Sequence, residues 1–160
     1  MGEVIVKYYN NRIFVDISLK KYLFGFGKEK GKVIELDPYE CFYIIKKRKG
    51  MLEFEKRKIK DILEIIKILK IDPVIYRVFE DLRDRGYFIK IYNNRYIIVY
   101  EKGTDIERYL CYPIHERHII ESKEINYLLE LCKKLHIELL IAVVDIEGDV
   151  TYYKIKELRI

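Results

Sequence analysis

The most informative stretch of this sequence is LLIAVVDIEGDVTYY, which runs from Leu139 to Tyr153. Residues 139–144 form a continuous apolar run rich in β-branched side chains, which is typical of a strand buried on both faces. Gly148 permits backbone angles that a side chain would forbid, so the chain can reverse there, and residues 150–155 predict a return strand. The stretch also carries three acidic residues around that glycine: Asp145, Glu147 and Asp149.

These three acids admit two interpretations. In the first, they form the tip of a hairpin, where charged side chains are favourable because they face water. In the second, they dock on a basic surface of a partner protein. The local pattern is compatible with both interpretations.

The composition is that of a globular chain with a sizeable core. It has 160 residues, of which 50% are apolar and 36% are charged. This length suits one domain or two small ones. The net charge of +5 is compatible with an RNA or DNA partner without demonstrating one. Glutamine is absent and Ile, Lys, Glu and Tyr are abundant, which fits a protein from a hot environment, although AT-rich coding produces a similar bias.

The cysteines are few, widely spaced and odd in number: Cys41, Cys111 and Cys132. Without a Cys-x-x-Cys pair they predict neither a disulfide framework nor a zinc site. We therefore expect buried free thiols in a reducing cytoplasm, and no metal or other cofactor. We also expect no signal peptide and no membrane span, because no apolar run is long enough to cross a bilayer.

Residues 1–71 predict an N-terminal unit. Residues 3–17 alternate apolar and polar side chains on either side of Asn10-Asn11, which predicts a hairpin. Residues 25–31 predict a flexible, charged loop, and their glycine spacing does not match a phosphate-binding fingerprint. Two further strands are expected in this unit, at residues 32–36 and 51–54.

Two helices are predicted in the same unit. Asp37-Pro38 begins the first, because the carboxylate can accept from orphan amides and proline needs no amide donor at that position. We expect this helix to stop at Gly50, after the basic turn Lys46-Lys47-Arg48-Lys49, which could contact RNA or simply face solvent. The second helix is predicted over residues 58–70. Its expected inner face is apolar: Ile59, Ile62, Leu63, Ile66 and Leu69.

Residues 72–160 predict a C-terminal unit, which begins where Ile71-Asp72-Pro73 breaks the preceding helix. A helix is expected to start at Asp72 and to end with Gly86 in the left-handed conformation. Pro113 is expected at a sheet edge or a bulge, because it cannot donate a backbone hydrogen bond. The later elements are strands at 87–92 and 95–100 joined by Asn93-Asn94, a strand at 109–116 and a helix at 122–135.

Three blocks of the C-terminal unit resemble the archaeal tRNA-splicing endonucleases. The first is Tyr76–Lys90, where a helix ends in Asp-Leu-Arg-Asp-Arg-Gly-Tyr. The second is Ile98–Gly103, which is similar to the family's catalytic-tyrosine strand, and the third is the opening stretch, 139–153. The blocks occur in the family's order. The resemblance implies an α+β fold, with a small N-terminal α/β unit followed by an endonuclease-like α/β domain with a mixed or antiparallel sheet.

The resemblance also implies an activity. The family cuts precursor tRNA at intron boundaries without a metal, leaving a 2′,3′-cyclic phosphate. The 2′-hydroxyl of the RNA is the nucleophile, so a base must deprotonate it, an acid must protonate the leaving oxygen, and a cation must stabilise the charged phosphorane. In the family a tyrosine, a histidine and a lysine supply these roles.

Only one of these three positions keeps its residue type. Tyr100 matches the tyrosine. Carried forward without gaps, the histidine position falls on Leu110, and counted back from Ala142 the lysine position falls on Ile137. Neither aliphatic side chain can transfer a proton or carry charge. An alternative is that a shifted His115 and Lys134 restore catalysis around Tyr100, although a one-residue slip of the strand after Ile137 would reverse its faces.

The resemblance therefore favours the structural, non-catalytic chain of a heterotetrameric tRNA-intron endonuclease that acts on precursor tRNA. The expected partner is a catalytic endonuclease subunit. Asp145, Glu147 and Asp149 would be its docking acids, and an edge from Tyr152 and Tyr153 to Leu158 would pair with it. The alternatives are the catalytic subunit described above and a basic RNA-binding module without an endonuclease partner.

Overall fold

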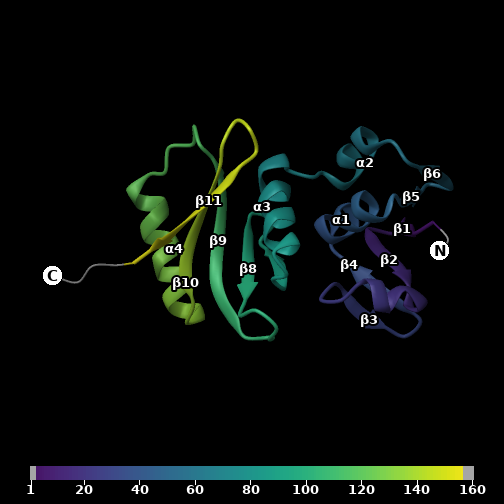
Figure 1. The fold of residues 1–160 in the computed structure, drawn as a ribbon, viewed down its shortest axis with the longest axis horizontal. Helices are drawn as coiled ribbons and strands as arrows, with labels where there is room; N and C mark the ends of the chain where they lie inside the picture. The colour runs from purple at the N-terminus through teal and green to yellow at the C-terminus, as the bar shows by residue number, and fades with distance from the viewer. Residues whose placement is uncertain (1–2, 157–160) are drawn as a thin grey trace. The chain divides into compact units, whose positions relative to one another are not determined.

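The structure, a computed structural model, describes residues 3–156 of the chain. The chain divides into two units, the first ending at Ile71 and the second beginning at Asp72 (Figure 1). Each unit has its own β-sheet and helices, and the α+β fold class predicted from the sequence is confirmed. Within the described residues, no helix is both long enough and apolar enough to cross a membrane.

Unit 1 is built on a six-stranded mixed sheet with the order β3-β4-β2-β1-β5-β6. β1 pairs in parallel with β5, and the other neighbours are antiparallel. The elements are β1 (Ile5–Tyr9), β2 (Arg12–Asp16), the 3₁₀ helix η1 (Ile17–Tyr22), β3 (Lys28–Lys30), β4 (Val33–Leu36), α1 (Pro38–Arg48), β5 (Met51–Phe54), β6 (Arg57–Ile59) and α2 (Ile62–Leu69).

Two local signals in unit 1 act as predicted. Asn10 and Asn11 have φ values of 50° and 58°, the left-handed pair that a tight hairpin turn requires. Asp37 accepts from the Glu40 amide at 2.8 Å, and the Glu40 carboxylate accepts from the Asp37 amide at 3.0 Å. The second oxygen of Glu40 accepts from the Gly27 amide at 2.7 Å, so this buried carboxylate also fixes the chain before β3.

The sequence predicts a flexible loop over residues 25–31, but residues 28–30 form the edge strand β3. β3 pairs with β4, where Lys30 Nζ lies 2.6 Å from the carboxylate of Glu35. All three β3 residues are exposed. An edge strand with both faces in water shows no apolar alternation, so the local pattern could not reveal it.

The helix predicted over residues 58–70 is shorter than expected. α2 begins at Ile62, and Arg57–Ile59 forms β6, which pairs with β5. Asp61 accepts from the Leu63 amide at 3.1 Å and so marks the start of α2. β5 and β6 form a tight hairpin that turns at Glu55 and Lys56, both with positive φ, and this pairing overrides the helical pattern.

The inner face of α2 also differs from the prediction. Ile65 and Leu69 are buried, whereas Ile62 and Leu63 are 38% and 69% exposed. Ile59, which the pattern places on the helical face, belongs to β6 instead. The inner face of α2 is therefore centred on Ile65 and Leu69, and not on the residues that the sequence pattern indicated.

The end of α1 differs in one detail. Lys49, and not Gly50, takes the left-handed conformation, with φ 50°, and donates to the Ile45 carbonyl. A Cβ at Gly50 would lie 2.6 Å from the Val4 carbonyl oxygen. Glycine is therefore required here by the close approach of the chain before β1.

Unit 2 contains a five-stranded sheet with the order β11-β10-β9-β8-β7, in which only β9 and β10 are parallel. α4 covers one face of the sheet, where its Leu128 and Cys132 belong to the same buried cluster as Ile141 (Figure 1). α3 covers the other face, where its Asp81 accepts a hydrogen bond from Tyr152. The elements are α3 (Pro73–Asp84), β7 (Ile89–Tyr92), β8 (Tyr96–Tyr100), β9 (Glu107–His115), α4 (Ser122–Leu135), β10 (Glu138–Val144) and β11 (Val150–Ile155).

The local signals of unit 2 are confirmed. Asp72 accepts from the next two helical amides at 2.8 and 3.2 Å and starts α3. Gly86 follows the helix with φ 88°. Asn93 and Asn94, with φ 51° and 55°, turn the chain between β7 and β8.

Pro113 is not at an edge, because β9 is the central strand of the sheet. Pro113 pairs with Ala142 of β10, while the described pairs with β8 run from Glu107 to Cys111. The proline therefore lies beyond the start of β8, at Tyr96. Its missing donor falls where β8 has no residue to accept from it.

The core of unit 2 on the α4 face is a cluster of buried residues: Tyr96, Ile98, Leu110, Tyr112, Ile114, Leu128, Cys132, Leu139 and Ile141. The cysteines are free and buried, as predicted. Burial raises the pKa of all three thiols, that of Cys132 to about 11, so they stay protonated and inert.

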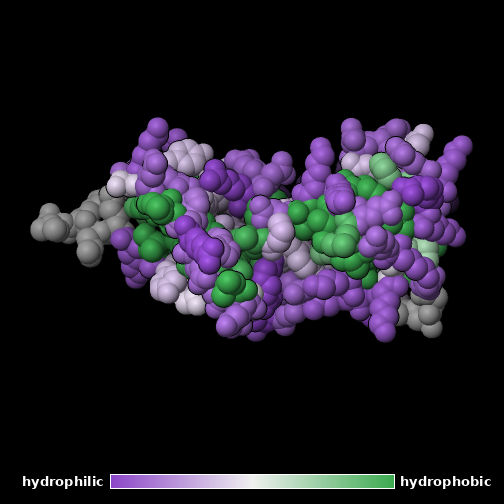
Figure 2. Space-filling view, turned by 90° about the horizontal axis from the view of Figure 1, so that it is seen from above, coloured by the Kyte–Doolittle hydropathy of each residue, from purple (hydrophilic) through white to green (hydrophobic). Residues whose placement is uncertain are grey.

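The face of the molecule shown in Figure 2 is mainly hydrophilic, with apolar patches between the charged side chains. Two of the exposed large apolar side chains of unit 2 lie in the hairpin of β10 and β11. They are Ile146, which is 72% exposed, and Tyr153, which is 53% exposed. The hairpin therefore presents apolar surface beside its acids.

Candidate functional site

The three positions that the resemblance assigns to catalysis meet at one end of the unit 2 sheet. Tyr100, the last residue of β8, pairs with Glu107 at the start of β9. Leu110 pairs with Leu139 near the start of β10, and Ile137 directly precedes that strand. β8 runs opposite to the parallel pair of β9 and β10, so the end of β8 lies beside the starts of the other two.

These positions also share one face of the sheet. Tyr100 and Ile137 are partly buried and pack against the cluster under α4, of which Leu110 is a member. Leu110 is 0% exposed. The structure brings the three positions together, but the one at 110 is a core position that no substrate can reach.

The charge around Tyr100 does not favour phosphate chemistry. Burial raises the pKa of Tyr100, and the carboxylates of Glu107 and Asp105 raise it as well. At neutral pH the phenol is therefore protonated and can donate a hydrogen bond, but it cannot accept a proton. Two nearby carboxylates also disfavour the extra negative charge of a phosphorane.

The two residues proposed as substitutes lie in different places. His115 is the last residue of β9, a nine-residue strand that begins at Glu107. At about 3.3 Å per residue, it lies roughly 26 Å along the strand from the Tyr100 end. Lys134 is exposed in the last turn of α4, which leads into Ile137. The structure does not bring His115 to Tyr100.

A pocket of about 480 Å³ lies beside Ile137, between the end of α4, the start of β10 and the end of β11. Its titratable lining residues are Cys132, Lys133, His136, Glu138 and Lys156. Tyr100 is not among the described residues that line this pocket. Sequence reasoning missed this pocket because its walls come from three separate elements.

The acidic loop lies at the opposite end of the sheet, between β10 and β11. The Asp145 carboxylate accepts from the amides of Glu147 and Asp149, both at 2.9 Å. The Asp145 amide donates to the Asp149 carbonyl at 3.0 Å, and Gly148 has φ 86°. Asp145 therefore shapes the loop from within, whereas Glu147 and Asp149 are exposed.

The three carboxylates of the loop form a concentration of negative charge. Each offers an oxygen, and these oxygens lie within 4.8 Å of one another. Like charges at this spacing repel, so the approach of a positive group from outside would stabilise the loop. The geometry suits a cation or a basic side chain.

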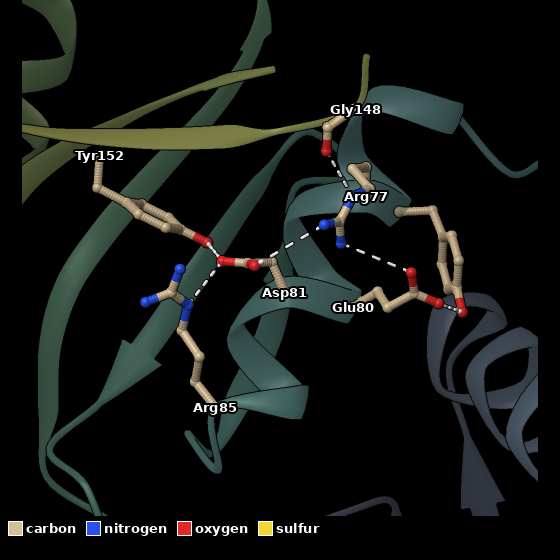
Figure 3. A network of polar contacts seen from close by, with 7 residues as sticks. Arg77, Glu80, Asp81, Arg85, Gly148 and Tyr152 are labelled. Atoms are coloured by element: carbon tan, nitrogen blue, oxygen red, sulfur yellow. Dashed lines mark hydrogen bonds and ion pairs between the residues drawn. The ribbon is translucent and has the colours of Figure 1, made fainter. Parts of the chain in front are cut away.

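α3 holds the loop and β11 through a polar network (Figure 3). Arg77 Nε donates to the Gly148 carbonyl at 2.7 Å, and the Arg77 guanidinium lies 3.9 Å from the Asp81 carboxylate. The same carboxylate accepts from the Tyr152 hydroxyl at 2.7 Å and from Arg85 Nε at 2.9 Å. Residues far apart in the sequence therefore fix the position of the loop.

This network changes the expected role of Tyr152. Burial raises its pKa, as does the hydrogen bond to Asp81, so the hydroxyl remains a donor. Tyr152 thus makes an internal contact, while Tyr153 faces the other side of the sheet and is 53% exposed. β11 is the terminal strand of the sheet, and its outer edge has no strand partner among residues 3–156. Residues 157 and 158 of the predicted pairing edge lie outside the described residues.

A second polar cluster, which the sequence did not predict, lies near the same end of the sheet. The Tyr112 hydroxyl donates to the Glu124 carboxylate and accepts from Arg95 at 2.9 Å. Arg95 and His118 lie 3.2 and 3.6 Å from Glu124. Burial raises the pKa of Tyr112 to about 12, and the Tyr112 hydroxyl lowers the pKa of Glu124. The cluster joins β8, β9 and α4.

Known proteins match the chain over both units. A family model described as tRNA intron endonuclease, catalytic C-terminal domain, matches residues 73–152. The tRNA-splicing endonuclease of Pyrococcus furiosus is 30% identical over 137 residues, which cover 82% of this chain and 81% of that protein. That of Pyrococcus horikoshii is 26% identical over 98% of this chain and 88% of its own length. That of Methanococcus vannielii is 27% identical over 84% and 81%.

Proposed function

The chain belongs to the tRNA-intron endonuclease family, and we propose that it is the structural, non-catalytic subunit of a heterotetrameric enzyme of this kind. In this role it positions catalytic subunits on precursor tRNA so that they excise the intron. Its partners are a catalytic chain of the same family and the tRNA itself, in the cytoplasm. The family model that matches this chain is named for a catalytic domain, so the proposal depends on what stands at its catalytic positions.

The main support for the proposal is the residue at position 110, which is a buried leucine. Transphosphorylation needs a group that transfers a proton at this position, and the side chain is an aliphatic one that is fully buried. The lysine position holds Ile137, which packs against the same cluster. Tyr100 alone cannot supply base, acid and cation.

The acidic loop supports a role in assembly. Its exposed acids, Glu147 and Asp149, stand beside the exposed apolar side chain of Ile146. The loop is held by hydrogen bonds from Arg77 and within itself, so little conformational entropy is lost when a partner binds it. A rigid acidic loop with an apolar tip fits a basic cleft of the catalytic subunit.

Cleavage and co-purification test the role directly. The purified full chain is incubated with a bulge-helix-bulge RNA, alone and after mixing with a catalytic chain of the family. We expect no cleavage by this chain alone and a stable 1:1 complex with the catalytic chain. Cleavage by the chain alone that is lost in Tyr100→Phe would contradict the proposal. Failure to form the complex would favour an RNA-binding module instead.

The docking role of the loop has its own test. Asp149→Lys places a cation where we propose that the partner presents cations, so assembly should weaken about tenfold or more. Sedimentation of the reconstituted complex measures the change. Glu121→Lys, an equal change of charge at an exposed residue before α4, is the control and should assemble like the wild type. Equal assembly of both variants would remove the loop from the interface.

A further inference from the structure

The net charge of the chain is divided unevenly between its two units. Residues 1–71 carry 17 Lys and Arg against 10 Asp and Glu, a formal charge of +7. Residues 72–160 carry 14 against 16, a formal charge of −2. The positive charge therefore lies in unit 1, outside the region that the family model matches. Polyanions are attracted to such an excess, and their binding depends on where the cations gather.

Cations from two elements of unit 1 gather around one aromatic ring. Lys21 Nζ lies 5.0 Å from the centroid of the Tyr22 ring, and the Arg48 guanidinium carbon lies 5.1 Å from it. Lys21 belongs to η1 and Arg48 to the last turn of α1. Exposed Lys20 and Lys49 are their sequence neighbours. We call these five residues the Tyr22 cluster.

Three of the four cations of the Tyr22 cluster are available to a ligand, whereas Lys20 forms an ion pair with Glu29. Among residues 3–156, no carboxylate forms an ion pair with Lys21, Arg48 or Lys49, whose side chains are all exposed. Several arginines of unit 2 are engaged instead, such as Arg77 and Arg95, which lie within ion-pair distance of carboxylates. A phosphate would thus meet free cations in unit 1.

The fold holds these like charges together at a cost. The C-terminus of α1 carries a partial negative charge, which compensates roughly half an elementary charge within the last turn. Lys49 takes the left-handed conformation there, with φ 50°. The Tyr22 ring attracts the cations of Lys21 and Arg48. These effects position the cations, but their mutual repulsion is relieved fully only when an anion covers them.

We propose that the Tyr22 cluster binds the phosphate backbone of RNA. The inference rests on the proposed function for the identity of the polyanion, a precursor tRNA, and it adds a contact surface in unit 1. Lysine is depleted at protein–protein interfaces, whereas Lys and Arg make most phosphate contacts. Three of the four cations in the cluster are lysines, so RNA fits this surface better than an acidic protein does.

Charge reversal tests the surface with a matched control. The test variant is Lys21→Glu with Arg48→Glu, and the control is Lys56→Glu with Lys58→Glu, which changes two exposed lysines of unit 1 beside or within β6 by the same charge. Fluorescence anisotropy of a labelled bulge-helix-bulge RNA hairpin measures binding to the full chain over a series of KCl concentrations.

We expect the test variant to bind this RNA at least tenfold more weakly at 100 mM KCl, and the control within about threefold of the wild type. Each lost phosphate contact should also reduce the slope of log affinity against log salt by about 0.7 to 0.9, so by roughly 1.5 for the pair. Lys21→Gln with Arg48→Gln is a second variant, because glutamate is unfavourable at the end of α1. It loses the same two contacts, so its slope should also be reduced by roughly 1.5, with a smaller loss of affinity than in the glutamate variant.

Three outcomes would overturn the proposal. They are unchanged RNA affinity in both cluster variants, equal losses in the cluster and control variants, and no binding of this RNA by the wild-type chain at 20 mM KCl. Assembly with the catalytic chain is measured in parallel. If the cluster variants assemble poorly but bind RNA normally, the surface contacts protein and the proposal is wrong. The structural-subunit role fails separately, if the wild-type chain cleaves RNA alone or does not assemble.

Discussion

The two ends of the unit 2 sheet are built in opposite ways. At the end where β8 stops, Tyr100 stands beside aliphatic side chains at positions 110 and 137, and all three pack against an apolar cluster. At the other end, the loop between β10 and β11 is held by a charged side chain from α3 and by the carboxylate of Asp145. Apolar packing dominates at the Tyr100 end, whereas hydrogen bonds fix the arrangement of polar groups at the loop end.

This difference agrees with the proposed structural role. A buried polar group destabilises a fold unless its partners satisfy it, so a chain without chemistry to perform gains stability from leucine and isoleucine. A polar network around an exposed loop contributes less to stability but fixes the loop's shape. The contrast favours the loop end as the working surface of unit 2.

The largest effect is expected from a histidine at position 110, which would give the first end of the sheet the catalytic residue type of the family. Leu110→His places an imidazole in a fully buried apolar site and removes the packing of a leucine. We expect the free energy of unfolding to fall by about 3–5 kcal/mol. Chemical denaturation followed by circular dichroism measures the loss.

Leu110→Met is the control for this substitution, because it nearly conserves volume and adds no polar hydrogen-bonding group. It should cost less than about 1.5 kcal/mol. A histidine variant within 1 kcal/mol of the wild type would show that position 110 opens to solvent. The first end could then hold a catalytic group, and the comparison would fail.

Asp145 sharpens the comparison at the other end. Asp145→Ala leaves the amides of Glu147 and Asp149 without their acceptor, which should cost about 1–2 kcal/mol of loop stability and weaken assembly about tenfold. Asp145→Asn keeps an acceptor oxygen and should assemble within about threefold of the wild type. Sedimentation of the reconstituted complex compares the two variants.

The two variants separate shape from charge. If Asp145→Asn weakens assembly as much as Asp145→Ala, the negative charge itself contacts the partner. Asp145 would then act as a docking acid, as the sequence suggests, and not as a positioning residue. Thermal unfolding of each variant shows whether any loss of assembly comes from a less stable fold.

Much of this fold follows from local signals in the sequence. Asn10-Asn11 and Asn93-Asn94 favour left-handed turns, and Asp37 and Asp72 cap helices, so the hairpins and helix starts could be predicted. β3 and β6 could not, because each is a three-residue edge strand, wholly or mostly exposed, that shows too little apolar alternation to be recognised. The place of Pro113 also depends on where its neighbour β8 begins.

The candidate site was less predictable than the fold. The sequence shows that position 100 keeps the tyrosine of the family, whereas positions 110 and 137 hold aliphatic residues in place of histidine and lysine. Only the pairing of β8, β9 and β10 shows that these positions lie at one end of the sheet. It also shows the acids of the loop without revealing that Asp145 is turned inward. Neither Arg77 nor Tyr152 carries a local signal for its contact, since their partners lie about 70 residues away in the chain.

The two ends should also respond to pH in opposite directions. The pKa of Glu124, near the loop end, is lowered first by the hydrogen bond from Tyr112 and then by the charges of His118 and Arg95. A lowered folded-state pKa contributes stability above the ordinary value of 4.5, and this is lost as pH falls through the folded pKa. The pKa of Tyr100 is raised, so its contribution is present below pH 10 and lost as pH rises through the folded pKa.

The smallest predicted effect tests the acid side of this response. Glu124→Gln should flatten the fall in unfolding free energy between about pH 5 and pH 3, by a few tenths of a kcal/mol, because the Glu124 side chain is partly exposed, at 22%, and its charge is screened by solvent. Urea denaturation across this range measures it, and Glu121→Gln, whose side chain caps no helix amide, should keep the wild-type slope. If both variants show the same pH dependence as the wild type, the polar cluster of Tyr112, Glu124, Arg95 and His118 does not stabilise the folded chain through its charge. The loop end would then owe its rigidity to α3 and to Asp145 alone.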